Sequence, residues 1–131
     1  MSSQPIDDDL DPTARVSAMW WSEDETVMSV VSHALSSRAL TRGSWQAVKV
    51  QSVSIVEDDA VARQSAFEAF LRGVAHTLSS LQVPGRPSGI LGVGELRVHL
   101  ALSGPELARG VVFDPESLAQ LLPFGLSIYI D

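Results

Sequence analysis

Large apolar side chains occupy every second position between Glu95 and Ser103. One set comprises Leu96, Val98, Leu100 and Leu102, and the other comprises Glu95, Arg97, His99, Ala101 and Ser103. Because successive side chains of a strand point to opposite faces of the sheet, the pattern predicts a strand with one buried and one open face. Such strands are typical of antiparallel sheets. We therefore expect a sheet that leaves one of its faces free.

A second long strand is expected from Trp45 to Val56, in a stretch rich in Val and Ile. The parity of its apolar residues changes between Val50 and Val53. One extra residue in a strand swaps the face that all later side chains occupy. The change therefore predicts a β-bulge near Gln51–Ser52.

Periodicity and turn residues place the remaining elements. The expected order is a strand at 15–21, a helix at 22–35, a strand at 45–56, a helix at 57–81, strands at 95–103 and 110–113, a helix at 114–122 and a strand at 126–130. Ser22 and Glu25 have the spacing of a capping box at the first helix start.

These elements predict the α+β class. The last six, over residues 45–130, have the βαββαβ order of a ferredoxin-like sandwich. The first strand and helix are then an added N-terminal unit on an edge of the sheet. Residues 1–13 form a flexible acidic tail by composition, and residues 14–131 form a single domain with one core.

Composition narrows the classes of partner and compartment. The formal net charge is -7, and such a chain repels nucleic-acid phosphates and anionic lipid heads, so neither nucleic acid nor a membrane is expected as a partner. Cysteine is absent, which excludes disulfides and thiolate metal sites. The N-terminus lacks the apolar region of a signal peptide, and we expect a cytoplasmic protein.

No constellation of residues predicts catalysis. The Gly-rich loop from Gly89 to Gly94 follows a helix and precedes a strand, which is the reverse of a phosphate cradle. The histidines at 33, 76 and 99 share no metal-ligand spacing, and no serine-nucleophile elbow is present. We therefore expect no catalytic residue, no metal and no cofactor, and classify the chain as a non-enzyme.

The polar face of the expected sheet is the candidate binding surface. Arg97 and His99 lie on one face of their strand, and Tyr129 lies on the polar side of the last strand. If the faces align, these side chains converge with Lys49 or Gln51. An ordinary solvated face, or a second helix layer over it, are the alternatives.

Two adjacent tryptophans extend this candidate surface. Trp20 and Trp21 lie in one expected strand, so their side chains point in opposite directions and cannot both enter one core. One of them is expected to be partly exposed, and Trp is enriched in interface hot spots. The predicted partner-binding residues are Trp20, Trp21, Arg97, His99 and Tyr129.

Residues 94–130 contain a strand pair, then the helix start Asp114-Pro115-Glu116-Ser117-Leu118, then Gly125-Leu126-x-Ile128-x-Ile130. This order resembles the C-terminal half of a widespread bacterial domain family of unknown function. Asp8-Asp9-Leu10-Asp11-Pro12 and Thr41-Arg42-Gly43 are similar to its N-terminal motifs. The resemblance implies a small, non-enzymatic α+β domain similar to many bacterial immunity proteins, and implies no catalytic residue.

These features favour a protein-binding module, such as an immunity or accessory protein, which binds a protein partner or a second copy of itself through the open sheet face. An acidic surface with an exposed aromatic side chain suits a basic partner. The alternative is a small-molecule-sensing, ferredoxin-like regulatory domain.

Overall fold

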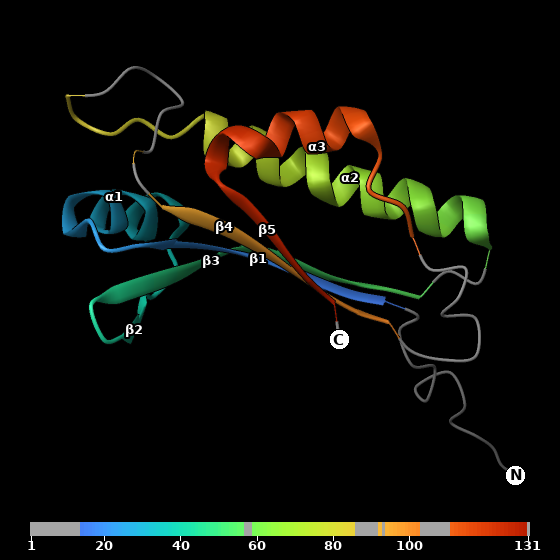
Figure 1. The fold of residues 1–131 in the computed structure, drawn as a ribbon, viewed down its shortest axis with the longest axis horizontal. Helices are drawn as coiled ribbons and strands as arrows, with labels where there is room; N and C mark the ends of the chain where they lie inside the picture. Colours follow the sequence, from blue (N-terminus) through green and yellow to red (C-terminus); the bar gives the residue numbers. More distant parts are fainter. Residues whose placement is uncertain (1–13, 57–58, 86–91, 93, 103–110, 131) are drawn as a thin grey trace, which may run out of the picture.

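A computed structural model describes residues 14–56, 59–85, 92, 94–102 and 111–130, which form a small α+β structure (Figure 1). Its elements are β1 (Ala14–Ser22), α1 (Glu25–Leu35), β2 (Leu40–Arg42), β3 (Trp45–Ile55), α2 (Ala60–Ser79), β4 (Glu95–Leu102), α3 (Pro115–Leu121), the 3-10 helix η3 (Leu122–Phe124) and β5 (Leu126–Ile130). The strands form one mixed sheet in the order β2-β3-β1-β4-β5. Of the strand pairs in the described residues, only β4–β5 is parallel. The predicted α+β class is confirmed, and the predicted tail at 1–13 lies outside the described residues.

Each described α-helix begins at an aspartate whose side chain accepts backbone N–H groups that the first turn leaves free. Asp59 accepts from the N–H of Ala62 at the start of α2, and Asp114 caps α3 ahead of Pro115. At α1 the capping residue is Asp24, so the capping box predicted for Ser22 and Glu25 is wrong. Ser22 is instead the buried last residue of β1, and its hydroxyl accepts the Asp24 N–H at 3.1 Å.

The position of β1 corrects the predicted topology. The N-terminal strand-helix unit was expected on an edge, but β1 is the central strand and pairs antiparallel with β3 on one side and β4 on the other. The ferredoxin-like order predicted for 45–130 is not confirmed, because residues 111–113 lie outside any strand and the centre of the sheet is β1, which comes from outside this segment. Strand pairing depends on contacts between segments that are distant in sequence, so local sequence patterns do not predict it.

The segment that was expected to form a strand at 110–113 is described from Val111 onward, and residues 111–113 lie outside any strand. The backbone of Val112 bonds the Gln64 side chain of α2 instead, with its N–H donating to Oε1 and its carbonyl accepting from Nε2, each at 2.8 Å. A helix side chain thus satisfies the backbone groups that a neighbouring strand would otherwise pair.

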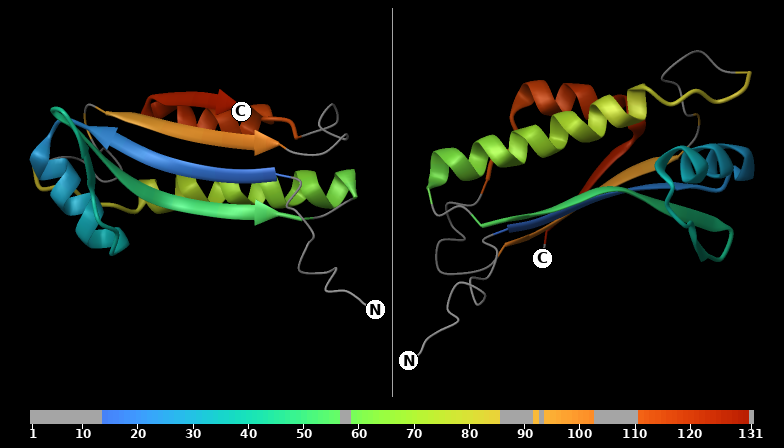
Figure 2. Two further views of the ribbon diagram at one scale, coloured as in Figure 1. Left: turned by 90° about the horizontal axis from the view of Figure 1, so that it is seen from below. Right: turned by 180° about the vertical axis from the view of Figure 1, so that it is seen from behind.

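The core lies between the sheet and α2 with α3, which cover one face (Figures 1 and 2), and α1 contributes Val27, Met28 and Val31 to it. The alternation predicted for β4 is confirmed, because Leu96, Val98 and Leu100 are buried there. The predicted bulge is also present, at Val50, since Ala18 pairs with Gln51 and the next residue of β1 pairs with Lys49.

Seen from below, the strands lie in front of α2 and α3 (Figure 2). No helix in the described part of the chain lies over this second face of the sheet, which we call the open face. The described helices include none that combines the length and the apolar character needed to cross a bilayer.

Candidate binding face

The strand register sets the layout of the open face. Side chains that are opposite each other on neighbouring strands share a face of the sheet. Across β3, β1, β4 and β5, this rule gives rows of Ser54, Arg15 and Ala101, then Ser52, Ser17, His99 and Tyr129, then Lys49, Met19, Arg97 and Ser127, and finally Ala47, Trp21 and Glu95. The open face therefore carries aromatic, cationic and hydroxyl side chains at neighbouring positions.

Four of the predicted site residues form one connected group, which we call the aromatic cluster: Trp21, Arg97, His99 and Tyr129. The guanidinium carbon of Arg97 lies 4.2 Å from the ring centroid of Trp21 and 5.7 Å from that of Tyr129. His99 stacks on Tyr129 with 4.8 Å between centroids and an interplanar angle of 11°. A cation above an aromatic face is attracted by the ring quadrupole, so these contacts bind the cluster together.

Glu95 and Ser127 hold Arg97 in this position. Arg97 Nε lies 2.9 Å from Glu95 Oε1, and the Ser127 hydroxyl donates a hydrogen bond to Glu95 Oε2. The Ser127 hydrogen bond and the nearby Arg97 guanidinium outweigh partial burial and lower the pKa of Glu95 below its ordinary value. The carboxylate therefore stays charged and fixes the guanidinium over the rings.

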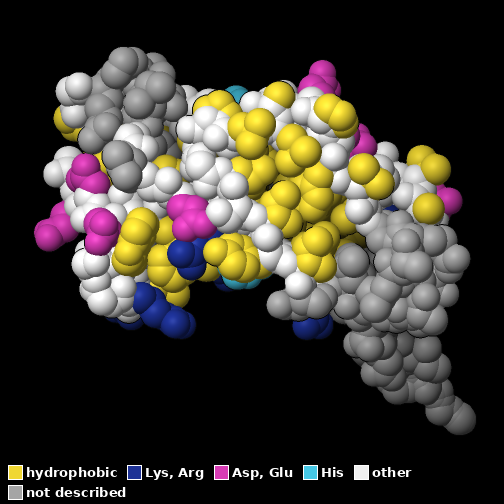
Figure 3. Space-filling view, viewed as in Figure 1, with side chains coloured by type: hydrophobic (Ala, Val, Ile, Leu, Met, Phe, Trp, Pro, Cys, Tyr) yellow, Lys and Arg dark blue, Asp and Glu magenta, His cyan; other side chains and the backbone are white. Residues whose placement is uncertain are grey.

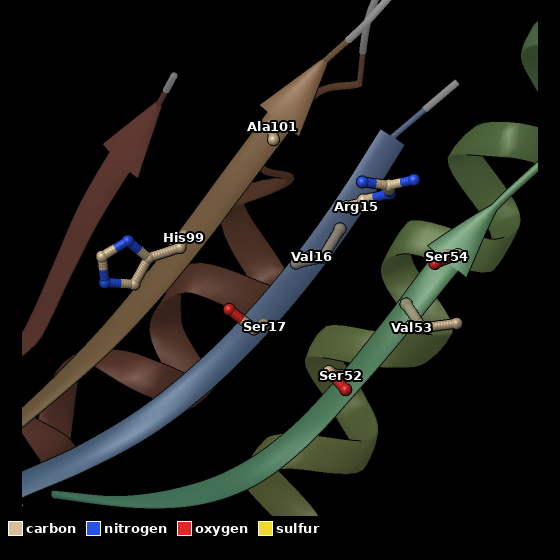
Figure 4. A pocket seen from close by; sticks show the side chains of 8 residues that line it. All are labelled: Arg15, Val16, Ser17, Ser52, Val53, Ser54, His99 and Ala101. Carbon is tan, nitrogen blue, oxygen red and sulfur yellow. The ribbon is translucent and has the colours of Figure 1, made fainter. Parts of the chain in front are cut away.

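A shallow hollow adjoins the aromatic cluster at the N-terminal end of β1 (Figure 4). Its volume is about 410 Å³, and its lining consists of Arg15, Val16, Ser17, Ser52, Val53, Ser54, His99 and Ala101. Figure 4 shows that Arg15, His99 and the serines come from three adjacent strands. Guanidinium and hydroxyl groups are hydrogen-bond donors, so the hollow offers donors to an anion.

The charge of the open face differs from that of the whole chain. The charged residues of β1, β3, β4 and β5 are Arg15, Lys49, Arg97 and Glu95, and the register places all of them on this face. Cations thus outnumber acids here, although the chain has a net charge of -7. The net charge of the chain therefore does not describe this surface.

The fifth predicted residue, Trp20, is elsewhere. It is 1% exposed and packs in the core on the helix side of β1, so a partner cannot touch its ring. The expectation that one of the two tryptophans is partly exposed is confirmed, because Trp21 is only partly buried. Gln51, which was also expected on the candidate surface, lies on the helix side, since its side chain approaches Gly73 of α2.

Sequence reasoning missed Arg15 and Ser17. The signal was present, because Ala14, Val16, Ala18 and Trp20 alternate with Arg15, Ser17, Met19 and Trp21 through β1. Among the described residues, no group of three or more His, Asp or Glu side chains could hold a metal ion.

Comparison of the chain with family models, with curated proteins and with solved structures found no match. The resemblance of residues 94–130 to a bacterial domain family stays a prediction.

Proposed function

We propose that this chain is a non-enzymatic protein-binding module of the immunity or accessory type, which captures its partner through the open face. The observation that carries the proposal is the aromatic cluster, in which Trp21, Arg97, His99 and Tyr129 meet on the side of the sheet that no described helix covers. Trp, Tyr and Arg are the side chains that most often dominate binding energy at protein interfaces.

The cluster is well suited to binding because its side chains are already ordered. Immobilising a flexible side chain at an interface costs about 0.5–1.5 kcal/mol. Arg97 is held by Glu95, and His99 is stacked on Tyr129, so part of this cost is met before a partner arrives. Tyr129 is still 41% exposed and can bury further surface.

The charge of the face favours an acidic partner. Arg15 and Lys49 add to the cationic character around the cluster, and Glu95 is engaged with Arg97. Complementary charge guides association and excludes wrong partners. The proposal of an acidic partner replaces the basic partner that the net charge of the chain suggests.

Affinity capture from the native host, with quantification of the recovered proteins, tests the proposal. Wild type is expected to recover a partner that Trp21→Ala and Arg97→Gln lose and that the matched control Val61→Ala, on the exposed start of α2, retains. Recovery should also weaken as salt rises, because exposed charges are screened. Equal recovery by wild type and both open-face variants would contradict the proposal.

The hollow beside the cluster favours a second candidate function, the sensing of a small anion. This alternative rests on Arg15, Ser17, Ser52 and Ser54 and no longer on a ferredoxin-like topology. Amide NMR titration with inorganic phosphate and with succinate tests it. Saturable shifts at these residues in wild type and in Lys49→Gln, and their loss in Arg15→Gln, are expected. Unchanged spectra with both anions would set this function aside.

A further inference from the structure

The two edges of the sheet differ in how they are protected. β2, at one edge, has three residues, includes Arg42 and is followed by a tight turn at Gly43. β5, at the other edge, has five residues, Leu126-Ser-Ile-Tyr-Ile130, and none of them is charged or proline. Proteins usually shorten, charge or cover an edge strand, because its unpaired backbone recruits other strands. Within the described part of the chain, the outer side of β5 has no strand partner.

Successive residues of β5 direct their backbone N–H and C=O groups toward opposite edges of the strand. Leu96 of β4 donates its N–H to the Gly125 carbonyl at 3.1 Å. In a parallel ladder the bonded residues of one strand are every second residue, so Ser127 and Tyr129 direct their backbone groups toward β4. Leu126, Ile128 and Ile130 therefore direct both N–H and C=O outward, at the free edge.

The side chains of these same residues form an apolar row. Ile128 pairs with Val98 and Ile130 pairs with Leu100, so both isoleucines lie on the helix side of the sheet. They are nevertheless 38% and 63% exposed, since α3 does not cover the end of the strand. A broad group of hydrophobic side chains is visible in the middle of the molecule, where α3 and β5 lie in the same view (Figure 3). Exposed apolar surface of this kind marks an interaction site.

We infer that the free edge of β5 binds the same edge of a second copy of this chain, antiparallel and across a two-fold axis at Ile128. The segment is its own complement in this register. Ile128 faces Ile128 of the second copy, and Leu126 faces Ile130 of the second copy. These are the residues whose backbone groups point outward, so each opposed pair exchanges two hydrogen bonds. A two-fold contact requires such a self-complementary patch.

The side chains agree with this register on both faces of the joined sheet. On the helix side, Leu126, Ile128 and Ile130 meet only apolar residues of the second copy, which buries their exposed surface. On the open face, Tyr129 lies opposite Ser127 of the second copy. The two aromatic clusters then flank the two-fold axis, and the two open faces become one continuous surface.

Molar mass in solution tests the inference, by sedimentation equilibrium over the accessible range of concentration. Wild type is expected to have twice the mass of one chain. Ile130→Lys places a charge in the apolar row and should give the single-chain mass, because two lysines would be buried in each dimer. The matched control Leu40→Lys, on a side chain that is 55% exposed at the opposite edge, should remain dimeric. A monomeric wild type at every concentration would overturn the inference.

Cross-linking tests the register itself and does not depend on a disruptive variant. The chain has no cysteine, so Ile128→Cys introduces a single thiol. Opposed residues of a hydrogen-bonded pair have Cα atoms about 5.5 Å apart, which suits a disulfide. Mild oxidation should convert Ile128→Cys to a covalent dimer and leave Leu40→Cys unlinked. Equal cross-linking of both variants would overturn the register. The outcome concerns the β5 edge alone, so it leaves the proposed role of the open face to its own test.

Discussion

Trp20 and Trp21 are neighbours in sequence and belong to opposite sides of the same sheet. Trp20 lies under the helices and is 1% exposed, whereas Trp21 lies on the open face beneath the Arg97 guanidinium. The helix side of β1 is filled by apolar residues, and the open side carries Arg15, Ser17 and Met19. One strand therefore supplies stability through one set of side chains and a candidate binding surface through the other.

The largest expected effect is the difference in unfolding free energy between alanine variants of the two tryptophans. Trp20→Ala leaves a cavity in the core and should lower the free energy of unfolding by about 3–5 kcal/mol. Trp21→Ala removes a partly exposed ring and should cost less than half as much. Urea unfolding of both variants measures the difference. Equal losses would mean that the two faces are not distinct.

Gly94 lies against both tryptophan residues, at the Trp20 ring and at the Trp21 backbone. A Cβ at this position would lie 2.3 Å from Trp20 Cζ2 and 2.7 Å from the Trp21 carbonyl oxygen. Gly94→Ala should therefore destabilise the fold by about 1–3 kcal/mol through overpacking, as thermal unfolding would show.

A second glycine serves as the control for Gly94. A Cβ at Gly73 in α2 would meet only the Gln51 side-chain amide, at 3.2 Å, and that amide is the end of a flexible side chain. Alanine is also favoured over glycine inside a helix. Gly73→Ala is expected to be neutral or stabilising. A larger loss at Gly73 than at Gly94 would contradict the packing described for Trp20.

The helix layer depends on the cap of α2. The Asp59 side chain accepts the Ala62 N–H at 2.8 Å, so Asp59→Ala should lower the free energy of unfolding by about 1 kcal/mol. Asp59→Asn keeps the acceptor and serves as the control. Because the effect belongs to the helix side, the NMR shifts of the Tyr129 ring should not change. A shift there would show that the two faces are coupled.

The smallest expected effect concerns pH and the open face. The pKa of Glu95 is lower in the folded chain than its ordinary value, chiefly through the Ser127 hydrogen bond. A lowered folded pKa adds stability above the unfolded pKa, about 4.3 for Glu, and this stability is lost as pH falls through the folded pKa. The free energy of unfolding of wild type should therefore exceed that of Glu95→Gln at pH 7, with the gap closing in acid. A gap that widens in acid would contradict the assigned geometry.

Local patterns predicted the parts of this fold that depend on local geometry. The parity of Arg97 and His99 follows from alternation along one strand. A bulge near Gln51–Ser52 follows from a change of parity, and the structure has it at the preceding residue, Val50. The central place of β1 was not predicted, because which strands pair is decided by contacts between distant segments. The strand expected at 110–113 was wrong for the described residues 111–113, since Gln64 of α2 bonds the backbone of Val112.

The candidate site was predictable to the same extent. Tyr129 joins His99 only through the register of β5 against β4, which no local pattern contains, although its polar side was evident. Charge was misjudged for a different reason. The net charge of -7 is a sum over the chain, whereas the strands collect Arg15, Lys49 and Arg97 on one face.

Fluorescence quenching in a Trp45→Phe background tests most directly whether the open face is accessible and cationic. Iodide is expected to quench part of the emission more effectively than caesium. Replacing Trp21 by Phe should remove this part and leave the protected emission of Trp20. Complete protection of Trp21, or stronger quenching by caesium than by iodide, would show that the open face is not an accessible, cationic surface.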